Sequence, residues 1–150
     1  MTDQSNPLII PALRPLYDNF SDLVFALTRF VIGATFVPHG YVKLFTGNIQ
    51  NVAKGMAANG LEPALVVAYS LGALEFFGGI LLAIGLLTRP VAFLFFVEMA
   101  VATFLVHLPK GFFASAGGAE LVILLSLIPL FFAVRGGGKY SVDRVIGKEF

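Results

Sequence analysis

Ionisable side chains stand inside, or at the ends of, long apolar runs in this sequence. Such groups are costly in lipid unless they are paired or hydrated, so they mark a buried polar site by default. Imidazoles and carboxylates can bind and pass protons, while an ammonium or guanidinium group can hold an anion or a carbonyl oxygen. The residues of this kind are Arg29, His39, Lys43, Glu75, Glu98, His107 and Glu120.

The outer members of this set form the predicted ligand-binding site. At ~1.5 Å per helical residue, His39, Glu75 and Glu120 stand roughly 20 to 27 Å from the cytoplasmic ends of their runs, with Lys43 just beyond. Small residues around Glu75 favour close approach of a neighbouring helix. We therefore expect His39, Lys43, Glu75 and Glu120 to bind a polar head group, with Arg29 as a further candidate anchor.

An inner pair lies closer to the cytoplasmic side. Arg29 and Glu98 stand roughly 10 to 13 Å inside their runs, and an ion pair between them would set the register of the helices. Glu98 and His107 are nine positions apart and so lie on opposite sides of one helix. Either His107 is interfacial, or Glu98 faces a second protomer or another subunit.

The elements that position these residues are predicted from composition. The chain is 57% hydrophobic and 13% charged, with a mean hydropathy of +0.87, which is typical of an integral membrane protein. Runs at about 23–45, 64–87, 91–108 and 118–134 have the roughly 17 to 25 apolar residues that a spanning helix needs. Continuous apolar runs exclude the alternating pattern of a barrel. The predicted fold is all-α, an integral membrane four-helix bundle.

Short connections predict antiparallel neighbours and an up-down-up-down topology. We expect a lead-in segment at 1–22, a four-helix transmembrane domain at 23–135 and a basic tail at 136–150 that leaves the last helix through a flexible glycine run. Because Lys and Arg favour the cytoplasmic side, both termini are predicted to be cytoplasmic, and the protein multi-pass in the cell membrane. That side would hold Arg14, Arg89, Arg135, Lys139, Arg144 and Lys148, against Lys54, Lys110 and Lys43.

The absence of cysteine limits the chemistry of this chain. It excludes disulfides, thiolate nucleophiles, Cys-ligated zinc and iron–sulfur clusters. His39 and His107 could ligate haem, and with Glu75 and Glu120 could hold a metal ion. The neighbouring carboxylates, the phase of His107 and the lack of Glu-x-x-His pairs argue against both, so no metal ligand is assigned. The sequence has no basic run of the kind that binds nucleic acid, so no nucleic-acid partner is expected.

Five short motifs occur in order along the chain. They are Arg29 in the first run, H-G-x-x-K (39–43), G-x-x-E-x-x-G-G (72–79), G-L-x-T-R (85–89) and G-G-G-K-Y-S-V-D (136–143). As a set they resemble the DoxX family of small four-helix membrane proteins from bacteria and archaea, over about residues 23–143. The resemblance implies the fold. It implies a redox role more weakly, since some members are similar to subunits of a thiosulfate:quinone oxidoreductase and others are linked to oxidative or thiol stress.

Two functions are compatible with these features. The first is a quinone- or redox-linked subunit of a membrane oxidoreductase system, in which a quinone would use the outer polar site and a soluble or membrane partner subunit would supply the redox centre. The second is a non-catalytic scaffold that anchors soluble redox or detoxifying enzymes, its buried charges serving packing or homo-oligomerisation. Small-solute or proton transport is a third alternative. Whether the chain is itself catalytic, and on what substrate, stays open.

Overall fold

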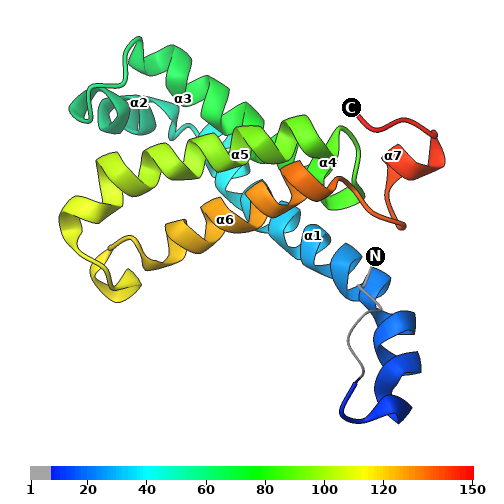
Figure 1. Ribbon diagram of the computed structural model, residues 1–150. Helices are drawn as coiled ribbons and strands as arrows, with labels where there is room; N and C mark the ends of the chain where they lie inside the picture. The colour runs from blue at the N-terminus through cyan, green and yellow to red at the C-terminus, as the bar shows by residue number, and fades with distance from the viewer. Residues whose placement is uncertain (1–7) are drawn as a thin grey trace.

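The structure is a computed structural model that describes residues 8–150, and within that range it contains helices and no strand. Figure 1 shows α1 running across the other helices and α5 and α6 lying side by side. The α-helices are α1 (Arg14–Phe45), α2 (Ile49–Ala58), α3 (Ala64–Ala73), α4 (Gly79–Ile84), α5 (Thr88–Ala102), α6 (Glu120–Arg135) and α7 (Val142–Val145). Short 3-10 turns are η1 (Pro11–Leu13), η4 (Leu108–Lys110) and η5 (Ala114–Ala116), and π-helical turns are η2 (Leu74–Gly78) and η3 (Thr103–His107).

Among the described residues, three helical segments are long and apolar enough to cross a membrane, namely Pro11–Phe45, Ala64–Ile84 and Thr88–Lys110. They correspond to the first three expected spans, although the second ends three residues earlier than expected. The expected fourth span corresponds to α6, which has 16 residues and packs along α5. Because α6 falls just short of the usual length of roughly 17 to 25 residues, its crossing remains a prediction.

Two segments expected to be connections contain helix. The expected lead-in 1–22 is helical from Arg14, where Pro15 in the first turn has the φ angle that a helix start needs. Residues 1–7 lie outside the described part of the chain. The long connection 46–63 contains α2, whose Ile49 and Ala53 pack on Ala68 of α3. An amphipathic helix of this length is stabilised by its neighbour and not by its own sequence.

Two π-helical turns interrupt the second and third candidate spans. The turn η2 contains Glu75, and the turn η3 ends at His107. A π-turn inserts an extra residue into a helix and changes the direction of the side chains around it, and such turns are frequent at functional sites. The turn η2 joins α3 to α4 in one long helix, whereas η3 extends α5 and is followed by the 3-10 turn η4.

Glycines allow α1 to lie directly on the second candidate span. A Cβ atom on Gly33 would come within 2.6 Å of the Gly79 carbonyl oxygen, and one on Gly79 within 2.8 Å of the Gly33 carbonyl oxygen. About two turns further along α1, a Cβ on Gly40 would collide with the main chain of Phe76. Small residues permit this close approach between membrane helices. The core beside it includes Phe36 stacked on Phe95, with ring centroids 3.9 Å apart.

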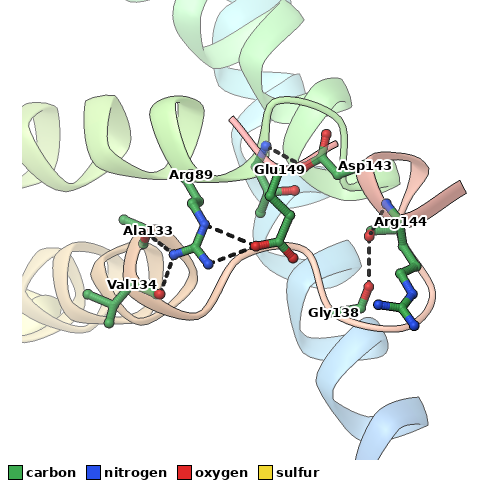
Figure 2. A network of polar contacts seen from close by, with 9 residues as sticks. Arg89, Ala133, Val134, Gly138, Asp143, Arg144 and Glu149 are labelled. Carbon is green, nitrogen blue, oxygen red and sulfur yellow. Dashed lines mark hydrogen bonds and ion pairs between the residues drawn. The ribbon is translucent and has the colours of Figure 1, made fainter. Parts of the chain in front are cut away.

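The C-terminal segment folds back on the turn between α4 and α5. Figure 2 shows Asp143 at the start of α5, where its carboxylate accepts hydrogen bonds from the main-chain N–H groups of Leu87 (2.8 Å) and Thr88 (2.9 Å). Arg89 donates to the Glu149 carboxylate (2.8 Å) and to main-chain carbonyls at the end of α6. The expected flexible exit is therefore a fixed segment, because it supplies the acceptor that the first N–H groups of α5 lack within their own helix.

Candidate functional site

Three ionisable side chains from three elements meet inside the protein. The Lys43 ammonium nitrogen, near the end of α1, lies 2.5 Å from Oε2 of Glu75 in η2. The Glu98 carboxyl group, on α5, lies close enough to interact with both. Glu75 is 4% exposed and Glu98 9% exposed, while the Lys43 side chain is 22% exposed. This trio, Lys43, Glu75 and Glu98, is called the acid–lysine cluster below.

The close packing of α1 explains how Lys43 reaches Glu75. Gly40 lies against the main chain of Phe76, the residue after Glu75, and Lys43 follows Gly40 by almost one turn. Lys43 also borders Gly72, since a Cβ there would lie 3.3 Å from the Lys43 Cβ. The long lysine stem can bury its methylenes against α3 while its ammonium reaches the carboxylate. The H-G-x-x-K motif thus places its cation on the glutamate of the next motif.

The cluster carries unsatisfied polar atoms. Oε2 of Glu75 and Oε2 of Glu98 are buried and lack a hydrogen-bond partner among the described residues. The Glu75 oxygen is in ion-pair contact with the Lys43 ammonium, although no hydrogen bond forms between them. Buried polar atoms are normally paired, so each exception calls for an explanation such as a bound ligand, a water molecule or a proton. The cluster can therefore accept hydrogen bonds, bind a cation or proton, and present an ammonium donor.

The other residues predicted for this site lie elsewhere. His39 is exposed, because it stands about 100° around α1 from Gly40, whose side of the helix packs on η2. Glu120 is exposed at the start of α6, and its carboxylate accepts a hydrogen bond from the main-chain N–H of Ala114 (3.0 Å). His107 is half-buried, with its Nδ1 atom 2.8 Å from the Gly117 carbonyl oxygen. These contacts belong to the loop between α5 and α6, which leaves Lys43 and Glu75 as the predicted residues that meet.

Arg29 forms no ion pair with Glu98, contrary to our expectation. Its buried guanidinium donates to the main-chain carbonyls of Leu82 (3.1 Å), Tyr140 (2.6 Å) and Gly137. The five N–H groups of a guanidinium suit such carbonyls, and the last carbonyls of a helix such as α4 lack intrahelical partners. Arg29 thus ties α1 and α4 to the C-terminal segment, and its role in the structure is to hold these elements together.

Glu98 comes near Glu75 because both lie at the same height from the α4–α5 turn. Glu75 comes ten residues before Gly85, and Glu98 ten residues after Thr88. Gly85 ends α4 in the left-handed conformation, with φ of 74°, and α5 begins at Thr88. The predicted spans place the α4–α5 turn three residues too late in the chain. As a result, the depths predicted for the two glutamates differ, and the two residues are assigned to different layers. Counting outward from the G-L-x-T-R turn would have paired them.

Sequence analysis also missed Asp143. It is 2% exposed, and besides its two carboxylate bonds its main-chain N–H donates to the Gly85 carbonyl oxygen at 2.9 Å. The motif G-G-G-K-Y-S-V-D contained it without showing where the carboxylate points. Its neighbour Ser141, at the start of α7, accepts a hydrogen bond from the Arg144 main-chain N–H, as helix-capping serines do.

Comparison with known sequences identifies the family. Residues 24–108 match the sequence profile of the DoxX family, a range that covers more than half of the chain and includes Lys43, Glu75 and Glu98. The chain belongs to the DoxX family. The predicted resemblance is therefore confirmed. Arg29 lies inside the matched range, while the C-terminal residues that it contacts lie beyond it.

Two relatives of this DoxX protein cover most of its length. An uncharacterized protein of Haemophilus influenzae is 40% identical over 127 residues, which is 83% of this chain and 91% of the relative. A Bacillus subtilis protein named "Putative oxidoreductase CatD" is 33% identical over 122 residues, which is 81% of this chain and 86% of the relative. No solved structure matches the chain. The family and the three long apolar helices make this a membrane protein.

Proposed function

We propose that this DoxX protein is a quinone- or redox-linked subunit of a membrane oxidoreductase system, with the acid–lysine cluster as its polar site. The observation that carries the proposal is the meeting of a lysine with two buried carboxyl groups, each of which has one oxygen without a hydrogen-bond partner among the described residues. Intramembrane ionisable groups of this kind mark functional sites by default. The name of the Bacillus subtilis relative adds support for redox chemistry.

The cluster has the groups that a quinone head group needs. Reduction of a quinone to a quinol takes two electrons and two protons. The Lys43 ammonium would donate a hydrogen bond to a carbonyl oxygen, and Glu75 and Glu98 would give protons to the head group or take them from it. The chain has no cysteine to hold an iron–sulfur cluster or a redox disulfide, and we propose that a partner subunit supplies the electrons.

Quinone binding is the direct test. The purified protein in lipid nanodiscs would be titrated with a short-chain ubiquinone, and tyrosine fluorescence would report binding. Loss of the charged donor in Lys43→Gln should weaken binding by about tenfold to a hundredfold, the range expected for a hydrogen bond to a charged group. Glu120→Gln, at an exposed carboxylate outside the cluster, is the matched control and should bind as the wild type does. A wild-type protein that binds no quinone would contradict the proposal.

A scaffold for soluble enzymes is the second candidate, and the folded C-terminal segment favours it. Arg29 and Asp143 hold this segment in place, and Arg144 and Lys148 are exposed on it. A fixed basic surface next to the membrane suits an acidic partner protein. Copurification from membranes with wild-type protein, and with Arg144→Glu together with Lys148→Glu, tests it. Equal recovery of partners from both proteins would count against the scaffold.

The topology is part of the same proposal. The α6 helix returns along α5, and Asp143 then reaches the beginning of α5. At ~1.5 Å per residue, the 16 residues of α6 extend about 24 Å, close to the ~30 Å hydrocarbon core. We therefore propose that α6 completes a four-helix, up-down-up-down bundle in the cytoplasmic membrane, with both termini cytoplasmic.

A further inference from the structure

Two buried carboxyl groups share one cation in the acid–lysine cluster. Glu75 and Glu98 are each more than nine-tenths buried, and each has one oxygen without a hydrogen-bond partner in the part of the chain that the structure describes. We propose that Glu75 and Glu98 hold one exchangeable proton between them, so that the pair is a proton-binding site. The inference names the proton that quinone chemistry at this site would use, and in that respect it rests on the proposed function.

The balance of charges around the site explains why the two carboxyl groups would retain one proton. Lys43 from α1 is the cation, and Glu75 from η2 and Glu98 from α5 are the acids. The helix α4 has no titratable residue, and α6 has none between Glu120 and Arg135 at its two ends. With both glutamates ionised, a site with little water would keep a net negative charge and a strong repulsion between neighbouring carboxylates. One shared proton brings the trio to neutrality.

The same proton would supply a hydrogen bond between the two carboxyl groups, whose Oε2 atoms have none among the described residues. An ionised carboxylate only accepts hydrogen bonds, so two of them side by side cannot bond to each other. A protonated carboxyl group has an O–H donor that its neighbour can accept, and charge-assisted hydrogen bonds of this type are short and strong. Geometry and charge therefore call for the same species, a carboxylic acid bonded to a carboxylate with Lys43 beside it.

Lys43 connects this proton to the outside of the bundle. Its side chain is partly exposed, while the two carboxyl groups are not. Movement of the long lysine side chain toward the head groups would uncover Glu75 and take the balancing charge away. We expect the proton to exchange on this path, which would let the site pass protons to or from a bound head group.

Labelling with dicyclohexylcarbodiimide tests for the proton. This apolar reagent adds to a protonated carboxyl group: the acid proton moves to a carbodiimide nitrogen, the carboxyl oxygen bonds to the central carbon, and the acyl group then migrates to nitrogen with no leaving group. Mass spectrometry of wild-type protein in nanodiscs should show one adduct per chain, on Glu75 or Glu98. Above the midpoint of titration, labelling should fall by about tenfold for each pH unit.

Single substitutions separate a shared proton from simple burial. In Glu98→Gln the remaining Glu75 carboxylate has Lys43 to itself, so it stays ionised and its labelling should fall about tenfold or more relative to wild type. Glu75→Gln should likewise reduce labelling of Glu98. The control Glu120→Gln should label as wild type does. Infrared spectra provide a second readout, in which the carbonyl stretch of a protonated carboxyl group should be present in wild type and absent in both cluster variants.

The outcomes are decisive in both directions. Undiminished labelling of Glu75 in folded Glu98→Gln would overturn the shared proton, and so would wild-type spectra without a protonated carboxyl band. If the variants fail to fold, the wild-type pH series and its infrared band still decide the matter. Neither measurement involves a quinone, so absence of quinone binding would remove the proposed function and leave the proton site standing.

Discussion

The ammonium nitrogen of Lys43 lies 2.5 Å from the Oε2 atom of Glu75, and the two residues come from α1 and from the π-helical turn of the second candidate span. This contact depends on Gly40, which lets the two helices touch through their main chains. The packing of one glycine therefore controls the geometry of the acid–lysine cluster.

Substitution of Gly40 by valine should destabilise the protein. The added side chain would meet the Phe76 main chain, which cannot move aside as a flexible side chain can. Overpacking of this kind costs about 1 to 3 kcal/mol, and the displaced α1 should pull Lys43 away from Glu75. Thermal unfolding in detergent measures the loss. Gly55→Ala, where nothing lies within 4 Å of the added methyl, should keep or slightly raise the stability.

Removal of the Asp143 carboxylate should release the C-terminal segment. In Asp143→Ala, the N–H groups of Leu87 and Thr88 lose their acceptors. Each buried donor left unpaired costs about 1 to 3 kcal/mol. Limited proteolysis should then cleave the segment after Arg135 faster than in wild type. The comparison is Asp22→Ala, which breaks only an exposed pair with Lys139 and should cost less than about 1 kcal/mol. Equal proteolysis of the two variants would argue against the capping role.

Arg29 should affect stability and leave quinone binding unchanged. Arg29→Lys keeps the charge, but an ammonium cannot reproduce the planar fork that now reaches three carbonyl groups. We expect a loss of about 1 to 3 kcal/mol in unfolding free energy from donors and acceptors left unpaired. Arg89→Lys, at a residue whose side chain is 37% exposed, should lose less. Weakened quinone binding in folded Arg29→Lys would contradict this prediction and show that Arg29 takes part in ligand binding.

The absence of cysteine makes the topology directly measurable. Lys110→Cys and Lys148→Cys each introduce a single thiol, one in the chain before α6 and one after it. With a membrane-impermeant maleimide added to intact cells, we expect labelling of Lys110→Cys and labelling of Lys148→Cys only after permeabilisation. Labelling of both from outside would show that α6 does not cross, and the reverse pattern would invert the orientation.

The glutamate pair shows where sequence reasoning reached its limit. Glu75 and Glu98 were both recognised as unusual, but their depths were counted from estimated ends of the apolar runs. An error of three residues at a helix end shifts the depth by about 4.5 Å. That shift placed Glu98 with Arg29. The positions of Gly85 and Thr88, where α4 ends and α5 begins, put the two glutamates at the same distance from the turn.

His39 and Asp143 show a second limit. His39 is one turn from Lys43, yet close packing at Gly40 turns one side of α1 toward η2 and leaves His39 exposed. Asp143 follows a glycine run that predicts a flexible segment. No local pattern shows that the Asp143 carboxylate accepts hydrogen bonds from a helix start more than 50 residues earlier in the chain.

The sequence by itself determined the helical membrane class, three long apolar helices, the family, and the set of ionisable residues that includes the site. These depend on local composition, because lipid demands apolar runs and makes each charge conspicuous. Only the tertiary structure decided which charges meet: Lys43 with Glu75 and Glu98, and Arg29 with main-chain carbonyls. Partner choice depends on helix phase, glycine contacts and the exact position of turns, and small errors in any of these move a side chain to another neighbour.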